Sequence, residues 1–130
     1  MKKLFAIASM VAVSLLLAGC SSSPTATNLD AQAFSQKTGE SGVVTLDVRT
    51  PGEFMVGHIQ GAINIDVEGL QFETEIAKLD KSATYAVYCH SGRRSGIAVE
   101  TMSKDGFKSL FNLTNGIADW QANNLPLVTS

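Results

Sequence analysis

Cys89 is the residue of this chain whose type and surroundings best suit it to chemistry. It follows the apolar run Tyr85-Ala-Val-Tyr88 and precedes His-Ser-Gly-Arg-Arg-Ser, a succession typical of a strand, a tight loop and the start of a helix. Gly92 permits backbone conformations that other residues resist, and Ser95 is a candidate cap for the helix. Backbone N–H groups and a helix N-terminus aimed at the sulfur favour the thiolate, which predicts a nucleophile. The alternative for an unpaired cysteine is an inert core residue.

The elements around this loop alternate between helix and strand. In the segment 50–57, Thr50 and Glu53 stand at the spacing of a capping box, with proline at the first helical position. In the segment 68–79 we expect Leu70, Ile76 and Leu79 to face inward. The alternation implies an α/β fold in which helices cover both faces of a parallel sheet. The patterns predict helices from Asn28 or Asp30 to Gly39, over 50–57, 68–79 and 95–104 and from Asn115 through Trp120, and strands over 43–48, 62–65, 84–88 and 108–113.

The amino-terminal segment has the parts of a secretory signal: two lysines, an apolar run and small residues. The run is about 15 residues long, shorter than the roughly 20 that a spanning helix needs. Its ending, Leu17-Ala-Gly-Cys20, resembles the bacterial lipobox, so we expect residues 1–19 to be a lipoprotein signal peptide and Cys20 to carry palmitate-type acyl chains. Ser21 resembles lipoproteins of the Gram-negative outer membrane. We therefore expect an envelope protein, lipid-anchored on the periplasmic side; the alternative is an uncleaved anchor or a plain secretory signal.

Removal of residues 1–19 leaves 111 residues, enough for one domain. We expect 20–28 to be the lipidated end and a polar tether, and 29–130 to be one monomeric domain. The mature part has 8 basic and 12 acidic residues, a net charge of −4, which argues against nucleic-acid binding. Two histidines and one free cysteine are too few for a structural zinc site, so no metal is expected.

Several sequence blocks together resemble the rhodanese-homology domain, in order and in spacing, over about residues 29–130. The resemblance implies a five-stranded parallel sheet sandwiched by helices, and a thiosulfate sulfurtransferase-like activity that moves sulfane sulfur through a cysteine persulfide. The blocks are Asp47-Val-Arg49-Thr-Pro-Gly-Glu-Phe, Gly57-His58-Ile-Gln-Gly-Ala-Ile-Asn, Cys89-His-Ser-Gly-Arg-Arg-Ser and Gly116-Ile-Ala-Asp-Trp, followed by Leu125-Pro-Leu.

The chemistry of such a loop is covalent and ping-pong. The Cys89 thiolate attacks the outer sulfur of thiosulfate, polysulfide or a related donor, and a thiophilic acceptor such as cyanide or a thiol then removes that sulfur from the persulfide. Backbone N–H groups directed into the loop stabilise the charged sulfur as an oxyanion hole does. No metal or organic cofactor is required. The residues expected to bind substrate are His90, Ser91, Gly92, Arg93, Arg94 and Ser95.

Charged residues near the loop have both functional and structural interpretations. Either Arg93 or Arg94 could contact the sulfonate of thiosulfate, or one of them could anchor the loop by pairing with a carboxylate. Asp47, Arg49 and His58 are interpreted as structural support. His90, which we expect to be exposed, could tune the access of acceptors.

Two other classes of protein compete with this interpretation. Cysteine phosphatases and arsenate reductases clamp an oxyanion with an arginine six positions after the cysteine, and here Ser95 occupies that position. A non-catalytic module that carries a persulfide or binds a partner is the second alternative.

Overall fold

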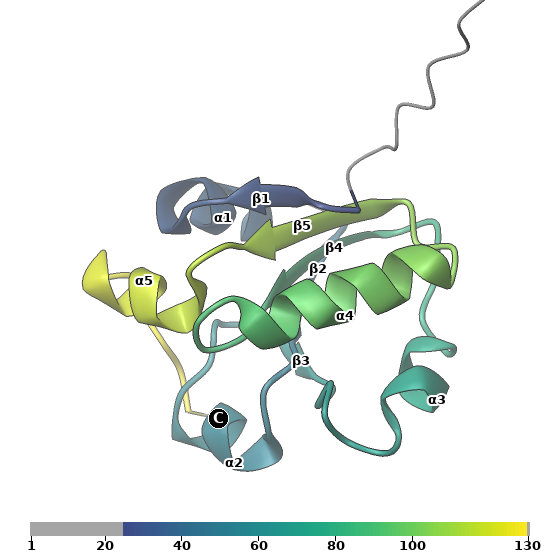
Figure 1. Cartoon of the computed structure of the whole chain (residues 1–130). Coiled ribbons are helices and arrows are strands. Elements are labelled where there is room, and N and C mark those ends of the chain that lie inside the picture. The colour runs from purple at the N-terminus through teal and green to yellow at the C-terminus, as the bar shows by residue number, and fades with distance from the viewer. Residues whose placement is uncertain (1–24, 130) are drawn as a thin grey trace, which may run out of the picture.

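Five parallel strands form the central sheet (Figure 1). The computed structural model describes residues 25–129. The expected α/β fold with a five-stranded parallel sheet is confirmed, and its middle strand leads directly into Cys89. The strands are β1 (Thr27–Leu29), β2 (Val43–Asp47), β3 (Ile63–Asn64), β4 (Thr84–Tyr88) and β5 (Ser109–Leu113), in the order β1-β5-β4-β2-β3 across the sheet.

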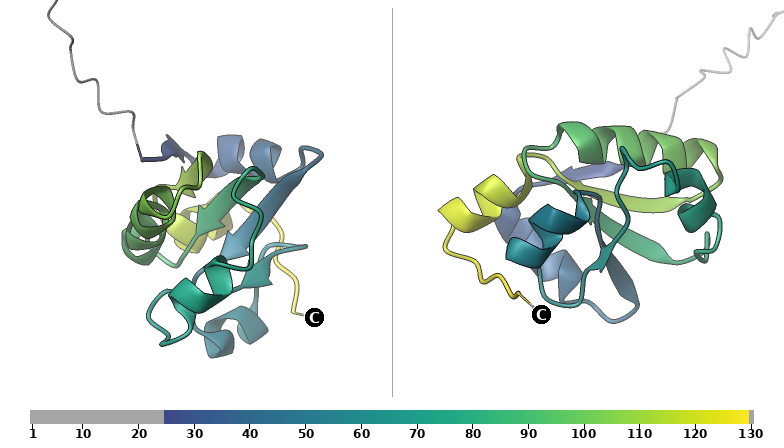
Figure 2. Two further views of the ribbon diagram at one scale, coloured as in Figure 1. Left: turned by 90° about the vertical axis from the view of Figure 1, so that its right-hand side faces the viewer. Right: turned by 90° about the horizontal axis from the view of Figure 1, so that it is seen from below.

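Helices lie on both faces of the sheet, as two further views show (Figure 2). On one face, Phe72 and Met102 belong to the core that includes α3 and α4; on the other, Phe34 and Trp120 belong to the core that includes α1 and α5. Because both faces are covered, the central strands are continuous apolar runs. The helices are α1 (Ala31–Thr38), α2 (Pro51–Val56), α3 (Phe72–Ile76), α4 (Arg93–Lys104) and α5 (Gly116–Ala122).

The alternation of side chains along β4 separates two functional groups. Tyr85, Val87 and Cys89 enter the core on the α4 side, whereas Ala86 and Tyr88 enter the core on the α1 side. Successive side chains of a strand point to opposite faces of the sheet. The thiol therefore lies under α4, and the tyrosine hydroxyl beside it in sequence lies on the far side of the sheet.

Two predicted helix starts have the expected caps. Asp30 caps α1, accepting a hydrogen bond from the N–H of Ala33, so the first helix begins after Asp30 rather than after Asn28. Thr50 and Glu53 form the capping box of α2. These local signals act within a few residues, which is why the sequence reveals them.

Strand β1 was not predicted from the sequence patterns, and it includes two residues of the expected tether. Thr27 and Asn28 belong to β1, which pairs with β5 in the register Thr27 to Phe111, so the sheet begins two residues before the expected domain start at Leu29. Its residues carry no strong strand signal. Pairing with a strand some 80 residues later in the chain orders them, since that edge of β5 offers free backbone groups.

The helix predicted over 68–79 is shorter in the structure, and Leu70 does not face inward. Asp66 accepts the N–H of Gly69 at 3.0 Å, and this turn delays the helix, so that α3 begins at Phe72. Phe72 and Ile76 fill the core, whereas Leu70 is 99% exposed. The turn rotates Leu70 away from the sheet.

The predicted signal peptide, Cys20 and most of the predicted tether lie outside the described residues. Between residues 25 and 129 no helix is long and apolar enough to cross a membrane. Within the same range, no three His, Cys, Asp or Glu side chains are grouped as metal ligands.

Candidate active site

The side chain of Cys89 is buried at the carboxyl end of β4, where the first turn of α4 begins. It is fully buried and is a free thiol. Its Sγ accepts a hydrogen bond from the N–H of Gly92 at 3.1 Å, and it lies 3.4 Å from the Ser95 Oγ. The sulfur therefore has polar contacts on the side of the helix N-terminus, whose dipole favours an anion.

These contacts determine the ionisation of the thiol. Burial raises the pKa of Cys89, but hydrogen bonds from the side chain and backbone of Ser95 and from the backbones of Gly92 and Ser91 outweigh it. The pKa consequently lies below the ordinary cysteine value. A thiol of this kind is a better nucleophile at neutral pH than the inert core cysteine of the alternative interpretation.

Two glycines allow the loop to pack against the connection between β5 and α5. Gly92 has φ +99°, and a Cβ there would lie 1.9 Å from the carbonyl oxygen of Thr114. Gly116 has φ +68°, and a Cβ there would lie 2.2 Å from the carbonyl oxygen of His90. The first N–H groups of α5 also bind the loop, since Ile117 donates to the carbonyl of Cys89 at 2.9 Å. Backbone contacts thus hold the loop in place around the sulfur.

Ser95 contacts the sulfur rather than capping the helix as predicted. The N-cap of α4 is Gly92, in a left-handed conformation that leaves no side-chain cap. The Ser95 side chain is buried and donates to the carbonyl of Gly92 at 3.2 Å, while the same oxygen lies beside Sγ. Helix α4 begins at Arg93, two residues earlier than expected. Gly92 adopts the left-handed conformation that precedes the helix, so no side-chain cap at Ser95 is needed.

The two arginines of the loop have different environments. Arg94 forms a two-pronged ion pair with Glu53 of α2, at 2.8 and 2.9 Å, and its side chain is 14% exposed. The hydrogen bond from Arg94 is the main reason that the pKa of Glu53 is lowered to about 2. Arg93 lies 3.3 Å from Glu68, and its side chain is 69% exposed. Arg94 therefore anchors the loop to α2, and Arg93 is the more available cation.

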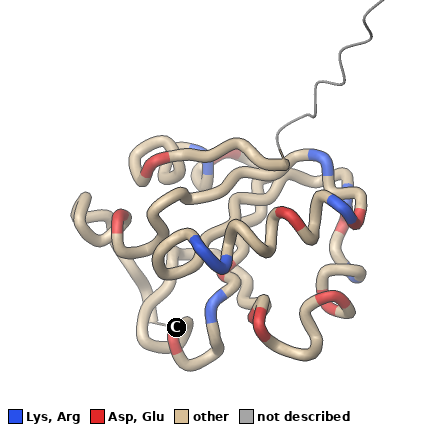
Figure 3. The backbone as a smooth tube through the Cα atoms, in the orientation of Figure 1, with Lys and Arg blue, Asp and Glu red and all other residues tan. Residues whose placement is uncertain are grey.

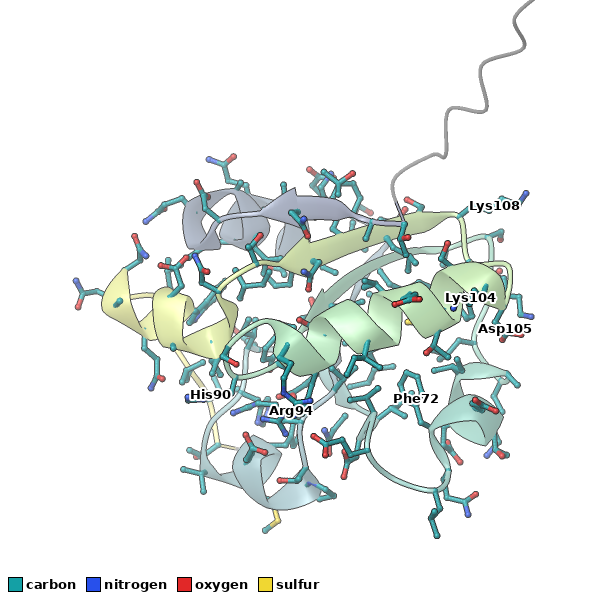
Figure 4. The ribbon with its side chains drawn as sticks, in the orientation of Figure 1. Phe72, His90, Arg94, Lys104, Asp105 and Lys108 are labelled. Carbon is teal, nitrogen blue, oxygen red and sulfur yellow. The ribbon has the colours of Figure 1, made fainter. Side chains whose placement is uncertain are left out.

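His90 is exposed and lies at a cleft of about 360 Å³ next to the loop. Val56, Ile117 and Leu127 give this cleft apolar walls, and Arg49 and Glu53 also line it. Figure 4 shows His90 and Arg94 at the amino end of α4, on the side toward α2.

Asp47 and Arg49 form a buried ion pair that braces the neighbouring turn. The Arg49 Nη2 lies 2.6 Å from an Asp47 carboxylate oxygen and donates to the carbonyl of Gly57 at 2.7 Å. The Tyr88 hydroxyl donates to Asp47 at 2.7 Å and accepts the N–H of Ile59 at 3.0 Å. Tyr88 and Cys89 belong to the cores on opposite faces of the sheet, so this network lies across the sheet from the thiol.

Tyr88 is the member of this network that sequence reasoning missed. Burial is the main cause that raises its pKa, and the charge of Asp47 adds to it. The position of Tyr88, directly before Cys89 in a buried strand, was the signal that could have revealed it. Its side chain must point to the face opposite the thiol, and a buried hydroxyl needs a hydrogen-bond partner there.

His58 is placed to hold the chain that follows α2. Its ring stacks on Phe54 with centroids 3.7 Å apart, and its Nδ1 lies 2.8 Å from the Phe54 carbonyl oxygen. Its backbone exchanges two 2.8 Å hydrogen bonds with Val128 near the end of the chain. Both the ring and the backbone of His58 are therefore engaged in structural contacts.

Known proteins share both the sequence and the fold of this domain. Residues 30–123 match the family model of the rhodanese-like domain. The chain is 37% identical over 90 residues to the putative sulfur carrier protein YrkF of Bacillus subtilis; the match covers 68% of this chain and about half (48%) of YrkF. It is 39% identical over 74 residues to the thiosulfate sulfurtransferase PspE of Escherichia coli, and that match covers 57% of this chain and 70% of PspE. The crystal structure of a rhodanese-related protein from Thermoplasma volcanium superposes with a TM-score of 0.69 at 31% identity, covering 80% of this chain and 99% of that one. The protein belongs to the rhodanese-like domain family.

Proposed function

We propose that this protein is a sulfurtransferase that carries sulfane sulfur as a persulfide on Cys89. The observation that carries the proposal is the buried Sγ, which the Gly92 N–H contacts at 3.1 Å and the Ser95 Oγ approaches to 3.4 Å. These polar groups point to where a negative charge on sulfur would lie. Similarity to PspE, a thiosulfate sulfurtransferase, supports the same chemistry.

The first half of the reaction loads the enzyme. The Cys89 thiolate attacks the outer sulfur of thiosulfate, a sulfur–sulfur bond forms, and the bond from that sulfur to the sulfonate breaks with its electron pair leaving on sulfite. The persulfide then carries the negative charge among the N–H groups of the loop. In the second half, cyanide or a thiolate attacks the outer sulfur and the Cys89 thiolate leaves.

The arrangement of the arginines argues against phosphoryl chemistry. A cysteine phosphatase needs a guanidinium directed into the loop to clamp its oxyanion, whereas Arg94 is directed at Glu53 and Ser95 occupies the sixth position after the cysteine. We therefore expect negligible hydrolysis of aryl phosphates compared with sulfur transfer.

We further propose that Cys20 anchors the protein in the cell envelope and that the active site faces away from the membrane. Because all strands are parallel, Thr25 and the start of β1 lie at the amino end of the sheet, opposite the Cys89 loop (Figure 1). Metabolic labelling with palmitate should mark the full chain, and a Cys20→Ala variant should lose the label.

Intact mass measurement tests the sulfur chemistry directly. Thiosulfate should add about 32 Da, one sulfur atom, to the protein, and cyanide should remove it. The matched variant Cys89→Ser should show neither step. Thiosulfate:cyanide turnover that persists in Cys89→Ser would overturn the proposal, and a stable mass gain without turnover would favour the non-catalytic carrier.

A further inference from the structure

The large apolar side chains that are exposed in residues 25–129 lie at the carboxyl end of the sheet. Met55 and Val56 are 71% and 81% exposed, Leu70 is 99% exposed and Ile97 is 47% exposed. We call these four residues the rim. Ile63, 38% exposed, lies at the same end, in β3 beside the last residues of β2. Apolar side chains grouped in this way mark an interaction surface rather than random exposure.

On one side, contacts of α2 place the rim next to the active-site loop. Glu53, two residues before Met55, is bound to Arg94 at 2.8 and 2.9 Å. Val56 lines the same cleft as His90. The exposed end of α2 therefore borders the loop directly.

On the other side, Leu70 and Ile97 border the same loop. Glu68, two residues before Leu70, lies 3.3 Å from Arg93. Ile97 follows Arg93 by four residues on α4 and so lies one helical turn away on the same face. The rim residues thus lie on the segments that flank the Cys89 loop, on the side from which we expect an acceptor to approach.

The residues nearest Leu70 in the chain include three acidic ones, of which Glu68 is paired with Arg93. Asp66, Glu68 and Glu73 lie within a few residues of it, and Glu68 and Glu73 are exposed. In Figure 3, acidic positions in red follow the segment below α4, and a basic stretch in blue lies at the amino end of that helix. The exposed carboxylate of Glu73 and the acidic balance of this edge favour a partner with basic residues.

We propose that the rim docks a protein acceptor whose reactive cysteine lies among apolar side chains bordered by lysine or arginine. This inference rests on the proposed function, because the acceptor must approach a persulfide on Cys89. Isolated small acceptors do not need four exposed apolar side chains. A protein acceptor would cover these side chains, and burial of their apolar surface would contribute to its binding.

The transfer step is balanced without an added oxidant. The thiolate of the acceptor attacks the outer sulfur of the Cys89 persulfide, a new sulfur–sulfur bond forms on the acceptor, and the old bond breaks to release the Cys89 thiolate. The proton of the persulfide, if it is protonated, travels with the transferred sulfur. One persulfide and one thiolate give one thiolate and one persulfide.

Short peptides that carry the two proposed features provide the test. The full domain is loaded with thiosulfate and then mixed with acetyl-Lys-Leu-Cys-Leu-Lys-amide or with acetyl-Glu-Ser-Cys-Ser-Glu-amide, and the loss of the persulfide is followed by intact mass. The measured quantity is the ratio of the two second-order rates. A double substitution, Met55→Ser with Leu70→Ser, should lower this ratio by about tenfold, the size expected for two partly buried apolar contacts.

The comparison between protein variants cancels the intrinsic reactivity of the two peptide thiols. The conservative pair Met55→Leu with Leu70→Met keeps the rim apolar and should keep the native ratio, and the rate with cyanide should be the same in all three proteins. A ratio that the serine pair leaves unchanged overturns this inference alone. Failure of thiosulfate to add mass, before any peptide is present, overturns the proposed function and this inference with it.

Discussion

Replacement of Ser95 by alanine isolates the hydroxyl that lies beside the reactive sulfur. The Ser95 Oγ is 3.4 Å from Sγ and also donates to the Gly92 carbonyl at 3.2 Å. That carbonyl keeps a second donor, the N–H of Gly96 at 3.1 Å, so the helix start survives the substitution. We therefore expect Ser95→Ala to fold and to raise the pKa of Cys89.

The size of the shift follows from the difference between two hydrogen bonds. A bond to a charged group contributes about 1.5–3 kcal/mol and a bond between neutral groups about 0.5–1.5 kcal/mol. The thiol donates its proton to the Ser95 Oγ, whereas toward the thiolate the hydroxyl turns its single proton from the Gly92 carbonyl to Sγ. Only the difference between these two bonds, about 1 kcal/mol, favours the thiolate. Since one pKa unit corresponds to about 1.4 kcal/mol, the pKa of Cys89 should rise by about 0.5–1 unit, with a lower thiolate fraction at neutral pH.

The rate of alkylation by iodoacetamide as a function of pH measures this pKa. Ser91→Ala is the matched control, because the pKa of Cys89 depends on the backbone N–H of Ser91 and not on its exposed side chain. The inflection of that control should coincide with the native one. An unchanged inflection in Ser95→Ala would refute the argument that the hydroxyl stabilises the thiolate.

Three further substitutions test the surrounding structure. Gly92→Ala, whose Cβ would lie 1.9 Å from the Thr114 carbonyl oxygen at φ +99°, should lower the free energy of unfolding by more than about 2 kcal/mol in urea titrations and abolish thiosulfate turnover. The pKa of Glu53 is lowered to about 2, so its ion pair with Arg94 stabilises the fold fully only above the unfolded pKa near 4.5. The native protein should therefore melt at a higher temperature than Glu53→Gln at pH 7. That difference should shrink as the pH falls from 4.5 toward 2. Tyr88→Phe, which removes a 2.7 Å hydrogen bond to Asp47, should cost about 1–3 kcal/mol in the same urea titrations while leaving turnover per folded molecule unchanged; a large loss of turnover there would assign the tyrosine a role in the chemistry.

Local sequence patterns determined the central strands, the capping box of α2 and the loop that follows β4. Each depends on residues within one turn or one strand of each other, such as Thr50 with Glu53 or Gly92 with Cys89. Physical preferences of that range are readable without a structure. The number of strands came from the family resemblance, since the patterns alone indicated four.

Contacts between distant residues decided the rest. Strand β1 exists because β5 lies beside it, and no pattern in Thr27–Leu29 anticipates that pairing. The sequence left open which arginine anchors the loop; Arg94 does so because α2 brings Glu53 within 2.8 Å across 41 positions of the chain. Burial on opposite faces of β4 then separates the thiol of Cys89 from the hydroxyl network of Tyr88. Such assignments depend on three-dimensional proximity and burial, which the order of residues encodes only through the complete fold.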